Sequence, residues 1–197
     1  MLREKLKGYT IVLASASPRR QQYLKELDAN FEIRLKEVEE IYPDTLKGTE
    51  ITEFLAKLKA EALEDTLSDN EILITSDTIV WHEGRALGKP RDSQDAFAML
   101  KSLSGKTHEV ITSVCIKNMR QTDVFSEITK VTFNPLTNEE IKYYLDNYRP
   151  FDKAGSYGIQ EWIGLVAIAR IDGSYANVVG MPVDKVYQHL LKFALNG

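Results

Sequence analysis

Cysteine is nearly absent from this chain of 197 residues, with Cys115 as its single example. One cysteine cannot form an intramolecular disulfide, so the class of small secreted domains held together by disulfides is excluded. Cys115 lies in the apolar run Glu109–Ile116, which predicts a buried strand residue rather than a reactive thiol. Folding must therefore depend on an apolar core, for which a hydrophobic content of 43% is ordinary.

Long hydrophobic runs and an excess of positive charge are also missing. No segment approaches the roughly 20 apolar residues of a membrane span, and Met1–Gly8 lacks the apolar stretch of a secretory signal. We therefore expect a cytoplasmic protein that does not bind membranes. The formal net charge of −4 disfavours binding to a nucleic acid polymer, but it leaves room for a small anion in a local basic pocket.

Several motifs of nucleotide and hydrolytic chemistry do not occur. The full glycine-rich P-loop pattern, the Rossmann glycine fingerprint and the Gly-x-Ser-x-Gly elbow of serine hydrolases are all absent. His82, His108 and His189 lack the spacing of zinc ligands, so we interpret them as structural or exposed residues.

The predicted elements alternate between strands and helices, which indicates one α/β domain over residues 1–197. Strands are predicted over residues 10–14, 31–35, 71–80, 107–117, 124–133 and 161–171. Helices are predicted to begin near Ser17, Thr52, Asp92, Thr137 and Val183. The last of these helices has an apolar stripe formed by Val183, Val186, Tyr187, Leu190, Leu191 and Ala194.

Polar residues gather where the first predicted strand meets the first predicted helix, in the run Ser15-Ala16-Ser17-Pro18-Arg19-Arg20. Small residues, hydroxyls and an arginine fork at a helix N-terminus suit a phosphate group. The alternative is an ordinary helix start, with Ser17 as a hydrogen-bonding N-cap, Pro18 in the first turn and solvated arginines. The segment by itself leaves both interpretations open.

A second polar cluster, Thr75-Ser76-Asp77-Thr78, interrupts a strongly apolar predicted strand. A carboxylate there is costly unless it is paired, hydrogen-bonded or bound to a metal. Asp77 is therefore either a metal ligand or general base, or a carboxylate bonded to nearby backbone amides. Lys89, in a Gly-Lys-Pro loop, and the long loop 146–160 are further candidates. Lys59 lies at the edge of a predicted apolar helix face, from which it could turn toward a cleft, although a lone lysine on a helix is usually solvated.

Six sequence blocks follow one another in a specific order. They are Leu13-Ala14-Ser15-Ala16-Ser17-Pro18-Arg19-Arg20, Ser76-Asp77-Thr78, Gly88-Lys89-Pro90-Arg91, Leu103-Ser104-Gly105-Lys106-Thr107-His108, Asp152-Lys153-Ala154-Gly155-Ser156-Tyr157-Gly158-Ile159-Gln160 and Gly173-Ser174-Tyr175-Ala176-Asn177-Val178-Val179-Gly180-Met181-Pro182. Each block is weak alone, but the ordered set resembles the Maf family of nucleoside triphosphate pyrophosphatases from about Ile11 to the final helix.

This resemblance implies an α/β fold similar to the inosine-triphosphate pyrophosphatases, with a mixed, strongly bent sheet flanked by helices and two lobes around a cleft. It implies hydrolysis of a nucleoside triphosphate between the α- and β-phosphates, with a divalent cation such as Mg or Mn. Asp77 matches the proposed proton acceptor and a metal ligand. Glu40 matches a second metal ligand, with Glu39 as the alternative. The matched substrate-binding positions are Ser15, Arg19, Arg20, Lys59, Thr78, Lys89 and Gln160.

Substrate choice is tied to the positions of Arg19, Thr78 and Gln160 in this resemblance. The run Gly158-Ile159-Gln160 resembles the family branch associated with dTTP and UTP, and modified pyrimidine nucleotides are included in the expectation. A thymine or uracil edge offers the O4 acceptor and the N3–H donor. A glutamine amide answers both, whereas a glutamate has no donor for O4. Glu161 stands where the resemblance predicts a glycine.

An ordinary aspartate is a weak base for bulk water, so the implied reaction needs help. Water activated by a bound metal is the favoured solution, and burial of the carboxylate is the other. Two alternative functions are a non-enzymatic regulator of cell division or septum formation and a purine-directed house-cleaning pyrophosphatase. A homodimer is a plausible expectation on general grounds.

Overall fold

The computed structural model describes the backbone of residues 2–195 and the side chains of residues 2–193. Tertiary contacts divide the chain into two compact units. The first unit takes in the residues up to Asp77, residues 112–127 and the residues from Gly180 onward. The second unit takes in residues 78–111 and 128–179. A single domain over residues 1–197 stays a prediction.

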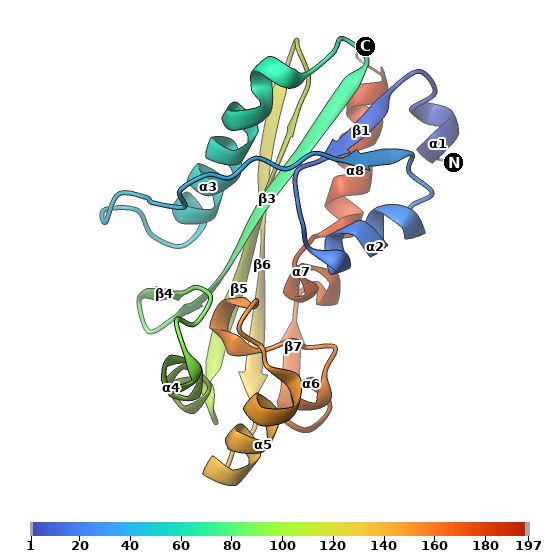
Figure 1. The fold of residues 1–197 in the computed structure, drawn as a ribbon. Helices are drawn as coiled ribbons and strands as arrows, with labels where there is room; N and C mark the ends of the chain where they lie inside the picture. Colours follow the sequence, from blue (N-terminus) through green and yellow to red (C-terminus); the bar gives the residue numbers. More distant parts are fainter. Residues whose placement is uncertain (1, 196–197) are drawn as a thin grey trace. The chain divides into compact units, whose positions relative to one another are not determined.

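Seven strands within residues 2–195 form a mixed sheet in the order β2-β1-β3-β5-β6-β7, with β4 beside β3 (Figure 1). The strands are β1 (Thr10–Leu13), β2 (Phe31–Ile33), β3 (Glu71–His82), β4 (Arg85–Leu87), β5 (Thr107–Lys117), β6 (Thr122–Phe133) and β7 (Ile168–Asp172). β1 pairs in parallel with β2 and β3, whereas the β3–β4 and β6–β7 pairs are antiparallel. The predicted mixed α/β class is therefore confirmed.

Two of the helices, α4 (Ser93–Leu103) and α5 (Asn138–Tyr148), begin directly after a residue whose side chain caps them. The helices are α1 (Leu2–Lys5), α2 (Pro18–Glu26), α3 (Thr49–Leu63), η1 (Glu64–Thr66), α4 (Ser93–Leu103), α5 (Asn138–Tyr148), η2 (Ala154–Ser156), α6 (Trp162–Val166), α7 (Tyr175–Val179) and α8 (Val183–Leu195). Asp92 accepts a hydrogen bond from the amide of Asp95, and Thr137 forms a complete capping box with Glu140. In the described part of the chain, no helix is long and apolar enough to cross a membrane.

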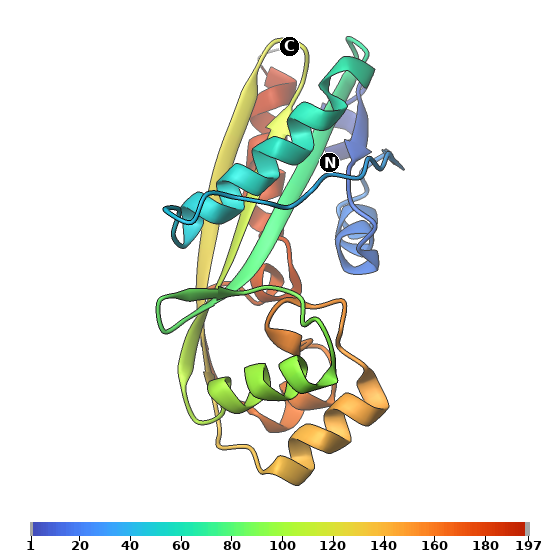
Figure 2. The same ribbon diagram turned by 60° about the vertical axis from the view of Figure 1, so that its left-hand side comes forward.

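The strands of the first unit bury alternate residues in two clusters, as a side-chain period of two requires. The cluster shared with α8 contains the strand residues Ile11, Leu13, Ile72, Ile74, Val114 and Ile116. The cluster shared with α3 contains the strand residues Val12, Leu73 and Cys115. Figures 1 and 2 show α3 and α8 on opposite faces of these strands. Five residues of the predicted apolar stripe of α8 belong to the first cluster or pack against it. The sixth, Ala194, has its side chain outside the described residues.

Cys115 is fully buried in this core, as predicted. Burial raises the pKa of its thiol to about 11. A thiol with so high a pKa carries almost no thiolate near neutral pH, and the thiolate is the nucleophilic form. Cys115 therefore acts as a small apolar core residue.

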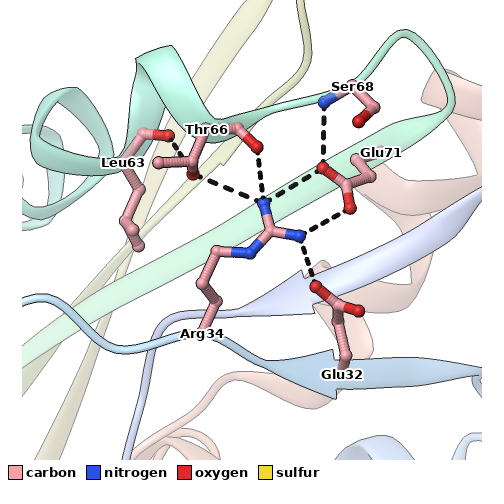
Figure 3. A network of polar contacts seen from close by, with 6 residues as sticks. All are labelled: Glu32, Arg34, Leu63, Thr66, Ser68 and Glu71. Atoms are coloured by element: carbon pink, nitrogen blue, oxygen red, sulfur yellow. Dashed lines mark hydrogen bonds and ion pairs between the residues drawn. The ribbon is translucent and has the colours of Figure 1, made fainter.

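Arg34 connects three segments of the first unit through one guanidinium group (Figure 3). It donates to the Thr66 carbonyl at 2.8 Å, to both carboxylate oxygens of Glu71 at 2.6 and 3.1 Å, and to Glu32. Glu71 also accepts from the Ser68 amide at 2.9 Å. The Arg34 contact lowers the pKa of Glu71, so this largely buried carboxylate stays ionised.

We predict that Arg34→Ala lowers the free energy of unfolding by about 1–2 kcal/mol, because it leaves the Glu71 carboxylate without its main donors. Urea denaturation at neutral pH measures this loss. Arg170→Ala is the matched control, since Arg170 is exposed and its contact is with the equally exposed Asp172. Equal stability of the two variants would contradict the structural role of Arg34.

The second unit contains a buried aromatic cluster around His108. The imidazole Nε2 lies 2.8 Å from the Tyr157 hydroxyl, and the ring makes edge contacts with Phe133 and Tyr157. Burial lowers the pKa of His108 to about 3, and the neighbouring His82 adds to this shift. His82 is also buried, with Nε2 3.0 Å from the Ser102 carbonyl oxygen. These two histidines are therefore structural, as predicted.

The low pKa of His108 predicts a loss of stability in acid. Between about pH 6.5 and pH 3 the unfolded chain binds a proton at His108 that the native protein does not bind. The free energy that the neutral, buried imidazole contributes to stability is intact above about pH 6.5. It is lost progressively as the pH falls toward about 3. We expect the free energy of unfolding to drop between pH 7.5 and pH 5, and to drop less in His108→Asn, whose amide cannot be protonated. Identical drops in urea titrations of both proteins would show that His108 is not responsible.

The predicted strand over residues 161–171 is wrong in its first half. Residues Trp162–Val166 form helix α6, and β7 begins only at Ile168. A short apolar run does not distinguish a strand from a buried helical turn. In the helix, Gly164 lies so close to Ile159, five residues earlier, that a Cβ atom would stand 1.8 Å from the Ile159 carbonyl oxygen, so a side chain has no room there.

Candidate functional site

The turn between β1 and α2 places Ser15 beside the start of the helix. Ser15 is 6% exposed, and its hydroxyl accepts from the Ser17 amide at 3.2 Å. Pro18 occupies the first turn as predicted, but Ser17 makes no side-chain capping bond, so that part of the expectation is wrong. The Ser15 hydroxyl binds the amide of Ser17 itself and not an amide of the first helical turn, so Ser17 is an N-cap by its extended backbone conformation only.

Arg20 reaches out of α2 and joins three segments of the first unit. Its Nε donates to the Gly180 carbonyl at 2.9 Å, and a terminal nitrogen donates to the Ser76 carbonyl at 3.1 Å and to the Ser15 hydroxyl at 3.4 Å. Arg20 is therefore not a solvated arginine. Its charge is fixed between the turn after β1, the middle of β3 and Gly180 in the segment before α8.

The electrostatic environment of Arg20 identifies its charged neighbours. Burial lowers the pKa of Arg20, and the half-buried Arg19 lowers it further. Asp77 and Glu40 act in the opposite direction and favour the cation. Two cations and two carboxylates from three separate stretches of sequence thus share one part of the first unit.

Lys59 connects the two carboxylates directly. Its Nζ lies 2.6 Å from Oδ1 of Asp77 in β3 and 2.8 Å from Oε1 of Glu40 in the loop between β2 and α3. The Lys59 side chain is only 17% exposed, so of the two interpretations from the sequence the solvated lysine is the wrong one. Asp77 is paired with an ammonium group, and between the two glutamates considered from sequence, Glu40 is the one that contacts Lys59.

The polar run in β3 is buried from Thr75 to Asp77. Thr75 is fully buried and donates to the Ala56 carbonyl of α3 at 2.6 Å. Ser76 is 1% exposed, and its hydroxyl has no hydrogen-bond partner among the described residues. A buried hydroxyl without a partner carries a desolvation cost. Asp77, at 7% exposure, is the residue next to it.

The donor set of the first unit suits a magnesium-type ion. The described residues contain no group of three His, Cys, Asp or Glu side chains placed to hold a metal. Mg²⁺, however, is commonly held by one or two carboxylates and completed by water and substrate phosphates. Glu40 and Asp77 provide two carboxylates that share one ammonium group. The residues present therefore fit a divalent cation that a phosphate ligand helps to hold.

Three predicted site residues belong to the second unit. Lys89 and Gln160 are exposed, and Thr78 is half-buried directly after Asp77. The Gly155 amide donates to the Gly88 carbonyl at 3.1 Å, which ties the Lys89 loop to the loop that ends in Gln160. Convergence of these residues with the cluster of the first unit stays a prediction.

Sequence reasoning missed two acceptors of Arg20. The carbonyl groups of Ser76 and Gly180 fix its guanidinium, and both residues lie inside the sequence blocks that resemble the Maf family. Every residue has a backbone carbonyl, so the residue type does not show which carbonyl accepts a hydrogen bond. The position of Ser76 and Gly180 in those blocks was the one indication of a contact with the site.

Comparison with known proteins gives consistent results. The profile of the family described as Maf-like protein matches residues 10–193. The dTTP/UTP pyrophosphatase of Flavobacterium psychrophilum is 62% identical over 191 residues, covering 97% of this chain and 98% of that protein. The protein of the same name from Flavobacterium johnsoniae is 61% identical, covering 96% and 98%. That of Bacteroides fragilis strain YCH46 is 52% identical, covering 94% and 96%.

One solved structure supports the fold. The Staphylococcus aureus Ham1 protein aligns with a TM-score of 0.51 at 14% identity, covering 91% of this chain and 99% of that chain. An identity this low supports a shared fold alone. It agrees with the mixed α/β architecture expected from the sequence.

Proposed function

Because this chain belongs to the Maf family, we propose that it hydrolyses nucleoside triphosphates, dTTP and UTP above all, to the monophosphate and pyrophosphate. The names of its relatives describe an enzyme, and they do not favour the alternative of a non-enzymatic regulator of cell division. The observation that carries the proposal is the cluster of Arg20, Lys59, Glu40 and Asp77 in the first unit. A cytoplasmic location and a homodimer stay predictions.

The proposed reaction breaks the bond between the α-phosphorus and the oxygen that bridges to the β-phosphate. A water oxygen attacks the α-phosphorus, Asp77 accepts the proton, and pyrophosphate leaves with the bridging oxygen. Arg19, Arg20 and Lys89 offset the negative charge that the phosphates carry and develop. Ser15 adds a hydroxyl donor at the helix start.

Glu40 and Asp77 would hold the divalent cation, Mg or Mn, between them and the substrate phosphates. Such an ion supplies charge neutralisation and lowers the pKa of bound water. Lys59 contacts one oxygen of each carboxylate, and a carboxylate has a second oxygen for another partner. Lys59 therefore keeps the two carboxylates close without an ion, which lowers the cost of assembling the site.

Asp77→Asn should retain the fold and lower pyrophosphate release from dTTP by about 10²–10⁴-fold, since an amide keeps an oxygen for Lys59 but cannot accept the proton. Turnover is measured with Mg²⁺ or Mn²⁺ and again after chelation, which should abolish it. The matched control is Asp69→Asn, at an exposed residue just before β3. Full turnover of Asp77→Asn would remove Asp77 from the mechanism.

Gln160 would select the base through its amide, which can donate to O4 and accept from N3–H of uracil or thymine. We expect Gln160→Glu to lower kcat/KM for dTTP and UTP more than for purine triphosphates, because glutamate has no donor for O4. A panel of dTTP, UTP, dGTP and dATP tests this and the purine-directed alternative together. A wild-type preference for purines would replace the pyrimidine assignment.

A further inference from the structure

Glu161 lies at the centre of a polar network in the second unit. The Tyr144 hydroxyl donates to the Glu161 carboxylate, and the Lys153 ammonium lies 3.0 Å from its other oxygen. The Tyr144 hydroxyl in turn accepts from the Gly158 amide at 3.0 Å. Glu161 thus uses both carboxylate oxygens, and through Tyr144 it is connected to the backbone of Gly158.

Burial makes these contacts stronger than surface pairs. Tyr144 is 0% exposed, and the side chains of Lys153 and Glu161 are 11% and 23% exposed. Burial, together with the bond to Glu161, raises the pKa of Tyr144, so the phenol remains a donor. Charge-assisted hydrogen bonds in a largely dry environment hold their geometry better than solvated ones.

The network encloses the turn that presents Gln160. The Glu161 amide donates to the Gly158 carbonyl at 2.9 Å, and the Gly164 amide donates to the Glu161 carbonyl at 2.9 Å. Gln160 lies inside this turn with its side chain exposed, while the residues on both sides of the turn are fixed. Gly158 is tightly enclosed, since a Cβ atom there would stand 2.9 Å from Cδ of Glu161 and 3.0 Å from Cε of Lys153.

We propose that Glu161 is a positioning residue for base recognition: its contacts with Tyr144 and Lys153 fix the 158–161 turn and thereby the amide of Gln160. This inference rests on the proposed function, in which Gln160 contacts the base. A glycine at position 161, as the resemblance predicts, has no carboxylate for either partner. In this chain the turn is therefore held by the Glu161 side chain as well as by its backbone hydrogen bonds.

The test compares kcat and KM for dTTP and dGTP in Glu161→Gly, Glu161→Gln and Tyr144→Phe. We expect Glu161→Gly and Tyr144→Phe to lower the dTTP over dGTP ratio of kcat/KM about tenfold, mainly through a higher KM for dTTP. Glu161→Gln keeps an oxygen that accepts from the Tyr144 hydroxyl, so it should retain most of the wild-type dTTP over dGTP ratio of kcat/KM. Glu139→Gln, at an exposed residue of α5, is the control and should match the wild type.

Gln160→Ala distinguishes the proposed base contact of Gln160 from the proposed positioning role of Glu161. A ratio that falls in Gln160→Ala but is unchanged in Glu161→Gly overturns the positioning role of Glu161 alone. A fall of kcat on both substrates with an unchanged ratio overturns it too, because a merely structural residue behaves in that way. A wild-type protein that releases no pyrophosphate from any nucleotide sinks the proposed function and this inference with it.

Discussion

The ion pair between Lys59 and Asp77 is the contact on which the candidate site depends. A carboxylate in the middle of a buried strand is costly without a counter-charge, and α3 supplies one at 2.6 Å. The same ammonium also binds Glu40, so it draws the loop after β2 toward β3. One lysine therefore provides the counter-charge of the buried aspartate and contacts a second carboxylate beside it, and these are the two carboxylates that we propose hold a divalent cation.

Local rules in the sequence predicted much of the fold. β5 has the bounds expected from its apolar run, and the Asp92 cap and the Thr137 capping box form as their spacing requires. Such features depend on neighbouring residues only. The position of the carboxylate in β3 was also evident, because a charged residue inside an apolar run demands an explanation wherever the run folds.

Long-range contacts explain what the sequence did not reveal. Lys59 has the appearance of an ordinary surface lysine, since its partners lie 18 and 19 residues away. The helix at Trp162–Val166 is a local ambiguity instead, because a short apolar run is compatible with a strand and with a helical turn. The contacts of Glu161 were not predicted from the sequence either, although Glu161 stands where the resemblance to the Maf family predicts a glycine. In each case the residue type is compatible with several structures, and packing decides among them.

The most direct test of the account is the fate of the water oxygen. Hydrolysis of dTTP in ¹⁸O-labelled water with Mg²⁺, followed by mass spectrometry of the products, identifies the phosphorus atom that is attacked. Attack of water on the α-phosphorus should give one labelled oxygen in dTMP and an unlabelled pyrophosphate. Label in pyrophosphate, or formation of dTDP and inorganic phosphate, would contradict it.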